Sequence, residues 1–167
     1  MAGPRLVVVG PPGAGKTSVG QRVADRLALP FRDTDADIEA TAGKPISDVF
    51  IDDGEEAFRA LERAAVVDAL AGHDGVLAVG GGAVLDEDTR ADLADRTVVF
   101  LSVRLADAAK RVGLARDRPV LTLNPRAQLR VLLEARRPFY EQVATFEVNT
   151  DGRDVDAVTD DVMAALR

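Results

Sequence analysis

The stretch GPPGAGKT, residues 10–17, follows directly on a run of apolar residues near the start of the chain. It matches the pattern G-x-x-x-x-G-K-[ST] at Gly10, Gly15, Lys16 and Thr17. Glycines let backbone N–H groups converge on phosphate oxygens, and the N-terminus of a following helix favours negative charge. We expect Lys16 to reach the β- and γ-phosphates and Thr17 to place its hydroxyl on Mg²⁺. The stretch therefore predicts a strand, a loop and a helix that bind a nucleoside triphosphate.

The rest of the chain alternates apolar runs with segments of helical periodicity. Near-continuous apolar strands between helices indicate a parallel sheet that is covered on both faces. We therefore predict one α/β domain over residues 1–167, with three layers and a five-stranded sheet. The expected strands are residues 5–10, 30–35, 75–82, 97–103 and 145–150. The expected helices are residues 16–29, 46–71 with a break at DDG (52–54), 104–113, 127–144 and 154–167.

Composition limits the classes of function. The chain has 167 residues, a formal net charge of −7, no Cys, one Tyr and no Trp. The missing Cys excludes disulfides and thiolate metal sites, and the acidic balance with few aromatic residues disfavours nucleic-acid binding. No run approaches the roughly 20 apolar residues of a membrane span, and the N-terminal apolar run is too short for a signal peptide. We therefore expect a cytoplasmic protein without membrane or nucleic-acid partners.

The phosphate acceptor is the next question. The guanine-reading pattern N-K-x-D of switch GTPases is absent from the chain. A motor ATPase would have an acidic residue after its third strand, where this chain has three glycines at residues 80–82. The acidic strand end is instead the second one, at Asp33 and Asp35. A small phosphotransferase that holds its acceptor beside the loop fits this pattern best.

An ordered set of short motifs follows the loop, and with it the chain resembles the shikimate kinases over essentially its whole length. The resemblance implies a sheet with strand order 2-3-1-4-5, a mobile lid, and ATP-dependent phosphorylation of the 3-hydroxyl of shikimate with Mg²⁺. The motifs that carry it are DTD (33–35), FRALE (58–62), GGGAV (80–84), RDRPVL (116–121) and RRPFY (136–140).

The resemblance implies a nucleotide and metal site. Thr17 and Asp33 would hold the Mg²⁺. Residues 112–125 would form the lid and bring Arg118 onto the transferred phosphate, with Arg116 as its rival. Arg111 and Arg153 would sandwich the adenine. The full set of residues expected to bind ATP is Gly13, Ala14, Gly15, Lys16, Thr17, Ser18, Arg111, Arg118 and Arg153.

The resemblance also implies a shikimate site. It includes a substrate-binding region at about residues 33–62 and further residues later in the chain. Asp35 would accept hydrogen bonds from the substrate hydroxyls and stand nearest to a general base; its alternative role is the N-cap of a helix that begins at Ala36. Planar guanidinium groups suit the substrate carboxylate, and the pattern R-x-P-x-Y selects Arg136 over Arg137. The expected substrate residues are Asp35, Arg59 braced by Glu62, Arg136, Gly80, Gly81 and Gly82, and the ring walls Phe50 and Phe58, of which Phe58 is favoured.

Other functions remain open at this stage. The chain could be another small-molecule kinase of the same fold, such as a gluconate kinase or a nucleoside monophosphate kinase, although the DGFPR-type strand of the latter is absent. It could also be a nucleotide-binding module without turnover, which the presence of Lys16, Thr17, Asp33 and Arg118 disfavours. Small kinases of this type are commonly monomers, and we expect a monomer here.

Overall fold

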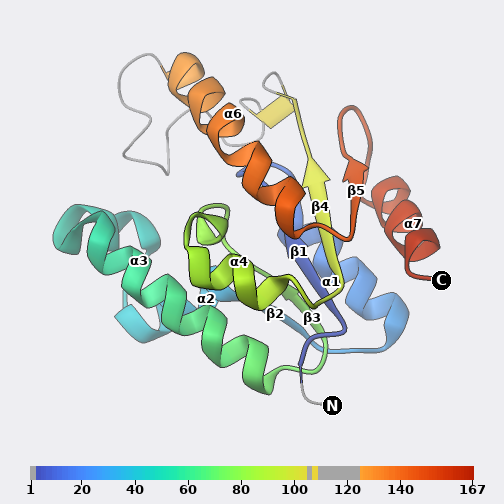
Figure 1. Cartoon of the computed structure of the whole chain (residues 1–167), viewed down its shortest axis with the longest axis horizontal. Helices are drawn as coiled ribbons and strands as arrows, with labels where there is room; N and C mark the ends of the chain where they lie inside the picture. The colour runs from blue at the N-terminus through green and yellow to red at the C-terminus, as the bar shows by residue number, and fades with distance from the viewer. Residues whose placement is uncertain (1–2, 105–106, 109–124) are drawn as a thin grey trace.

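A computed structural model describes residues 3–104, 107–108 and 125–167 of the chain (Figure 1). The strands are β1 (Leu6–Val9), β2 (Phe31–Asp33), β3 (Val76–Ala78), β4 (Val98–Ser102) and β5 (Phe146–Asn149). The helices are α1 (Lys16–Leu27), α2 (Thr34–Ala42), α3 (Ile46–Gly72), the 3₁₀ helix η1 (Ala83–Leu85), α4 (Glu87–Leu93), α6 (Pro125–Val143) and α7 (Val155–Ala165).

The strands form one five-stranded parallel sheet in the order β2-β3-β1-β4-β5. The predicted sheet and its strand order are therefore confirmed. In a parallel sheet all the carboxyl ends meet at one edge, which is where ligands bind in open α/β folds. At this edge the phosphate loop (residues 10–17) follows β1, Asp33 ends β2, and the glycine segment (residues 80–82) follows β3.

Strand β1 shows why the sheet needs cover on both faces. All four of its residues have no exposed surface. Leu6 and Val8 belong to the apolar cluster that includes α1 and α7, whereas Val7 and Val9 belong to the cluster that includes α3, α4 and α6. Helices lie on both sides of the sheet (Figure 1). Because neighbouring residues on a strand face opposite ways, burial on both faces requires the continuous apolar run seen in the sequence.

Helix α3 is bent where the DDG motif predicted a break. Gly54 has φ +89° and ψ 167°, which is outside the helical region and favours glycine. The second half of α3 carries Phe58, Arg59 and Glu62 into the middle of the molecule. The bend thus changes the direction of α3 between Phe50 and Phe58, whose rings stack on each other across it.

Three short helices, α2, η1 and α4, differ from the prediction. Helix α2 begins at Thr34, two residues before the expected start at Ala36, because Asp33 and not Asp35 is its N-cap. The 3₁₀ helix η1 and the seven-residue helix α4 follow the glycine segment, where the sequence analysis expected no helix. Asp86 caps α4, and its side chain accepts a hydrogen bond from the Thr89 amide at 2.9 Å.

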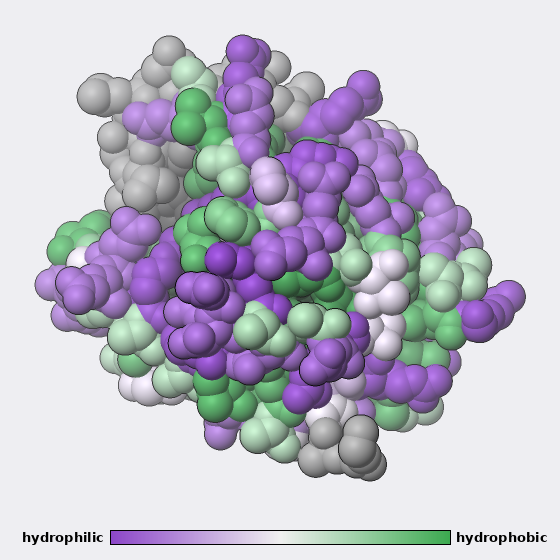
Figure 2. Space-filling view, in the orientation of Figure 1, coloured by the Kyte–Doolittle hydropathy of each residue, from purple (hydrophilic) through white to green (hydrophobic). Residues whose placement is uncertain are grey.

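The molecular surface is largely polar on the side of α3, α4 and α6. Figure 2 shows mostly hydrophilic side chains on this face, with smaller hydrophobic patches between them. On the other side of the sheet, two arginines of α1 pair with acidic residues of α7, namely Arg22 with Asp156 and Arg26 with Asp160. Among the described residues, no helix combines the length and apolar character that crossing a membrane requires.

Gly75 offers a test of how closely the backbones of β2 and β3 approach. A β-carbon on Gly75 would overlap the Pro30 carbonyl oxygen and lie 2.8 Å from its carbonyl carbon. We therefore expect Gly75→Ala to reduce the free energy of unfolding by about 3 kcal/mol. Gly72→Ala is the matched control, because nothing lies within 4 Å of that β-carbon and alanine favours the helix by up to about 1 kcal/mol. Urea denaturation of both variants measures the difference, and equal stabilities would contradict the packing described.

Candidate active site

The phosphate loop has the backbone that its glycines predicted. Gly10, Gly13 and Gly15 all have positive φ, at +155°, +83° and +86°. The Lys16 ammonium donates hydrogen bonds to the carbonyl oxygens of Gly10 at 2.9 Å and Pro11 at 3.1 Å. The lysine therefore lies across the loop, at the start of α1 and at the point where backbone amides and the helix dipole favour phosphate.

The first turn of α1 meets the end of β2 through one carboxylate. The Thr17 hydroxyl donates to Asp33 Oδ2 at 2.8 Å, and the Asp35 amide donates to Asp33 Oδ1 at 2.9 Å. Thr17 and Ser18 are exposed, whereas Ala14 is buried in the core. Hydroxyl and carboxylate oxygens are ligands that suit Mg²⁺. In the described ranges, no group of three or more acidic or His residues forms a metal cluster, so such an ion would need further oxygens from phosphate and water.

The glycine segment is crowded by charged side chains that reach it from three elements. A β-carbon on Gly80 would lie 2.7 Å from Asp35 Oδ1 and 2.9 Å from Glu62 Oε2. On Gly82 it would lie 2.7 Å from Arg59 Cζ, and on Gly81 it would lie 3.5 Å from an Arg136 nitrogen. A β-carbon on Gly80 or Gly82 would force these side-chain ends to move. The structure thus brings Asp35, Arg59, Arg136 and the three glycines together, as the sequence analysis expected.

Arg59 and Glu62 form a partly buried pair on the second half of α3. Arg59 Nη1 donates to Glu62 Oε1 at 2.8 Å, and Glu55 lies 3.6 Å from the other side of the guanidinium. Burial raises the pKa of the Glu62 carboxyl, and the neighbouring Arg59 opposes that rise. The expected bracing of Arg59 by Glu62 is confirmed.

Arg136 lies in a buried and positively charged setting. Burial lowers the pKa of its guanidinium, and the nearby charge of Arg59 lowers it further, while Tyr140 and Glu62 act in the opposite direction. Two like charges that are partly removed from water destabilise each other. An anion placed between Arg59 and Arg136 would relieve that repulsion, so the pair favours a ligand with a carboxylate.

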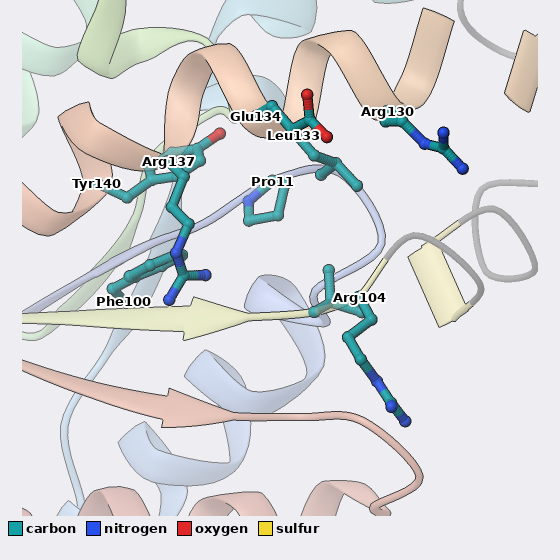
Figure 3. A pocket seen from close by; sticks show the side chains of 9 residues that line it. Pro11, Phe100, Arg104, Arg130, Leu133, Glu134, Arg137 and Tyr140 are labelled. Atoms are coloured by element: carbon teal, nitrogen blue, oxygen red, sulfur yellow. The ribbon is translucent and has the colours of Figure 1, made fainter. Parts of the chain in front are cut away.

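Arg137 lies on a different side of α6, as the sequence analysis expected. Its guanidinium contacts Glu147 at 3.1 Å and Glu141 at 3.8 Å, and 48% of its side chain is exposed. Arg137 lines a cavity of about 350 Å³ together with Pro11 and Tyr140, and Figure 3 shows it there beside Phe100. The two adjacent arginines therefore face different surroundings, and only Arg136 reaches the glycine segment.

The two phenylalanines expected to wall the substrate stack on each other. Their ring centroids are 4.5 Å apart, with 29° between the ring planes. Phe58 is 3% exposed and packs with Ile38 and Val49 in a small apolar cluster, while Phe50 is half-buried. Burial thus favours Phe50 as the ring with surface to offer a ligand, whereas the sequence analysis favoured Phe58.

The residues expected around the adenine and the lid are only partly described. Arg153 donates to the carbonyl oxygens of Asn149 at 3.1 Å and Ala157 at 3.0 Å, and it pairs with Asp161 at 2.8 Å. These bonds hold the guanidinium in the turn between β5 and α7. Arg111, Arg118, Arg116 and the expected lid up to residue 124 lie outside the described residues.

Two polar residues of the site were not assigned a role from the sequence. The Tyr140 hydroxyl donates to the Gly81 carbonyl at 2.5 Å, and the Thr34 hydroxyl accepts from the Gly80 amide at 3.1 Å. Burial raises the pKa of Tyr140 to about 12. A tyrosine in RRPFY and a threonine in DTD were visible in the motifs, but their partners lie far away along the chain.

The parallel sheet and the phosphate loop identify an α/β nucleotide-binding protein with a P-loop. Residues 12–167 match the family model described as shikimate kinase. The chain belongs to the shikimate kinase family, as the motif order indicated.

Individual proteins that are similar to this chain are also named shikimate kinases. The chain is 60% identical over 163 residues to a shikimate kinase of Salinispora arenicola, which spans 98% of both chains. The structure of shikimate kinase from Acinetobacter baumannii in complex with shikimate is similar, with a TM-score of 0.90 and 32% identity over 99% of this chain and 93% of that one. A gluconokinase from Sinorhizobium meliloti has a TM-score of 0.61 at 20% identity over 98% and 91%, which shows the fold alone.

Tyr140 gives a pH-dependent test of the site. The phenol of an unfolded chain has a pKa of 10.0, whereas burial raises the pKa of Tyr140 to about 12. Between these two pH values the folded protein therefore keeps the phenol proton. The unfolded chain therefore binds fewer protons in that range, and stability contributed by Tyr140 falls as the pH rises through it. Because the chain has one Tyr, tyrosinate absorption follows this residue alone. We expect a midpoint near 12 in the folded protein and near 10 in denaturant; a native midpoint near 10 would show an exposed phenol.

Proposed function

We propose that this protein transfers the γ-phosphoryl group of ATP to the 3-hydroxyl of shikimate, giving shikimate 3-phosphate and ADP. The observation that carries the proposal is the gathering of Arg59, Arg136 and Asp35 on the glycine segment, next to the phosphate loop. This arrangement offers two cations for a carboxylate and an acceptor for hydroxyl groups beside a donor phosphate. Membership of the shikimate kinase family and the likeness to a shikimate-bound structure support it.

The donor side of the reaction belongs to the phosphate loop. In this proposal Gly13, Ala14, Gly15 and Ser18 present backbone amides to the phosphates, and Lys16 exchanges its bonds to loop carbonyls for bonds to phosphate oxygens. The helix N-terminus at Lys16 adds a fixed positive potential. Arg153 supplies one face for the adenine, because its guanidinium is held in place by backbone carbonyls.

Two further residues and one segment of the donor side come from the family pattern alone. We propose that Arg118 stabilises the negative charge that develops on the transferred phosphoryl group, where electrostatic stabilisation has its largest effect on the rate. Arg111 would take the second face of the adenine. Residues 112–125 would act as the lid that keeps water from the donor, so that ATP is not hydrolysed in place of transfer.

Mg²⁺ fits the oxygens of Thr17 and Asp33. Their hydrogen bond of 2.8 Å shows that a hydroxyl from α1 and a carboxylate from β2 already meet at one point beside the loop. When bound there, the ion would neutralise charge on the β- and γ-phosphates. Thr17 would contact it directly and Asp33 would act on its water shell, while Asp33 also caps α2.

The acceptor side is formed by charges around the glycine segment. Arg59 and Arg136 would bind the carboxylate of shikimate, and Phe50, stacked on Phe58, would cover an apolar face of its ring. Asp35 would accept the proton of the 3-hydroxyl as the oxygen attacks the γ-phosphorus in line with the leaving ADP oxygen. We further propose that the enzyme acts as a cytoplasmic monomer.

A substrate panel tests the proposed function. ATP consumption is measured with shikimate, gluconate, AMP or CMP as the acceptor, because the last three represent the other kinases of this fold. We expect turnover with shikimate alone. Turnover with gluconate or a nucleotide in place of shikimate would overturn the proposal, and ATP binding without any turnover would favour a regulatory nucleotide-binding module.

The adjacent arginines of α6 provide a matched pair of variants. Arg136→Ala removes one partner of a desolvated charge pair, which typically costs about 2–5 kcal/mol of binding. Shikimate affinity should therefore fall by a factor of at least about 30, while ATP affinity changes little. Arg137→Ala removes a guanidinium that pairs with Glu147 instead and should leave both affinities unchanged. Isothermal titration measures them; unchanged shikimate binding by Arg136→Ala would move the carboxylate site elsewhere.

A further inference from the structure

The glycine segment is fastened to two neighbouring elements through its own backbone. The Gly80 amide donates a buried hydrogen bond to the Thr34 hydroxyl at 3.1 Å. The Gly81 carbonyl accepts from the Tyr140 hydroxyl at 2.5 Å. A segment without side chains has many accessible backbone conformations. These two bonds select one of them, from the start of α2 on one side and from α6 on the other.

Amides of the turn after the glycine segment donate hydrogen bonds to the other two glycine carbonyl groups. The Ala83 amide donates to Gly80 O at 3.0 Å, and the Leu85 amide donates to Gly82 O at 3.1 Å. All three glycine carbonyls thus have a donor. Within residues 3–104, 107–108 and 125–167, the amides of Gly81 and Gly82 donate to no protein acceptor. These two N–H groups therefore remain for the oxygens of a ligand.

The bond from Tyr140 controls the direction of one of these amides. The described part of the chain contains no cis peptide bond. In a trans peptide the carbonyl oxygen and the amide hydrogen point in opposite directions. The Gly81 carbonyl and the Gly82 amide belong to the same peptide unit. When the Tyr140 hydroxyl holds that carbonyl, it also aims the Gly82 N–H away from α6.

The same hydroxyl acts on the carboxylate-binding arginine. Arg136 lies four residues before Tyr140 on α6, so the two side chains are on the same face of the helix, and each lies near enough to affect the pKa of the other. The ring is 1% exposed and stacks on Phe100 with centroids 5.1 Å apart. A rigid ring thus holds one hydroxyl between Gly81 and Arg136.

We propose that Tyr140 is a positioning residue for shikimate, whose hydroxyl fixes the Gly81–Gly82 peptide and the Arg136 guanidinium relative to each other. This inference rests on the proposed function, because it concerns the geometry of the same acceptor site. Tyr140 acts through Arg136 and the glycine amides. Among the described residues, no hydrogen bond joins the Tyr140 hydroxyl to the phosphate loop, so we expect the effect to be confined to the acceptor.

Steady-state kinetics of Tyr140→Phe test the role. The variant keeps the ring and its stacking but leaves the Gly81 carbonyl without its donor, and a lost bond to a buried group reduces affinity by roughly tenfold. We expect KM for shikimate to rise about tenfold, while kcat and KM for ATP stay within about twofold. Val143→Ala is the matched control: it loses apolar contacts in the same helix and apolar cluster, so its melting temperature falls without a change in either KM.

The wild-type protein offers a second readout that does not depend on a folded variant. Tyr140 is the one Tyr, and there is no Trp, so tyrosine fluorescence and absorption come from this residue alone. Titration with shikimate, without nucleotide, should change the tyrosine signal in a saturable way, because the partners of the hydroxyl bind the ligand. Gluconate serves as the control ligand and should leave the signal unchanged.

The outcomes separate the two proposals. An active wild-type enzyme with an unchanged tyrosine signal on saturation by shikimate would overturn the positioning role. Equal KM values for shikimate in Tyr140→Phe and wild type, or an equal rise in Val143→Ala, would overturn it as well. A wild-type protein that phosphorylates another acceptor instead of shikimate would overturn the proposed function itself.

Discussion

Burial of β1 on both faces is the constraint on which the rest of the molecule depends. Each of its residues is removed from water, so helices must cover both sides of the sheet, and the neighbouring strands must be parallel to admit those helices as connections. All carboxyl ends then meet at one edge. The phosphate loop, Asp33 and the glycine segment share that edge because of the topology, although they lie in separate parts of the sequence.

At this edge charged side chains surround the backbone of the glycine segment. A methyl group on Gly80 would meet Asp35 and Glu62, and one on Gly82 would meet Arg59, while Arg136 lies beside Gly81. Arg59 and Glu62 compensate each other through a 2.8 Å bond, since an isolated charge would be costly to bury. The acceptor site is therefore shaped by charge and exposed peptide groups more than by apolar side chains.

The sequence predicted those parts of the structure that depend on local patterns. The phosphate loop, the strands and the bend at Gly54 each have a signal within a few residues. Helix α4 was missed because its seven residues are too few for apolar periodicity, and α2 began early because the side chain of Asp33 supplied its cap. The roles of Tyr140 and Thr34 could not be predicted from local patterns, since their partners are 59 and 46 residues away.

In the proposed acceptor site, the arginine pair would favour a carboxylate over a neutral sugar. Burial already lowers the pKa of Arg136, and Arg59 adds like-charge repulsion that the partly buried surroundings screen poorly. Glu62 offsets part of this charge from one side, but its own pKa is raised because burial disfavours its charged form. A carboxylate between the two arginines would stabilise both guanidinium charges, whereas a neutral ligand would leave the repulsion in place. Binding of an anion would therefore remove a repulsion that is present in the unliganded site.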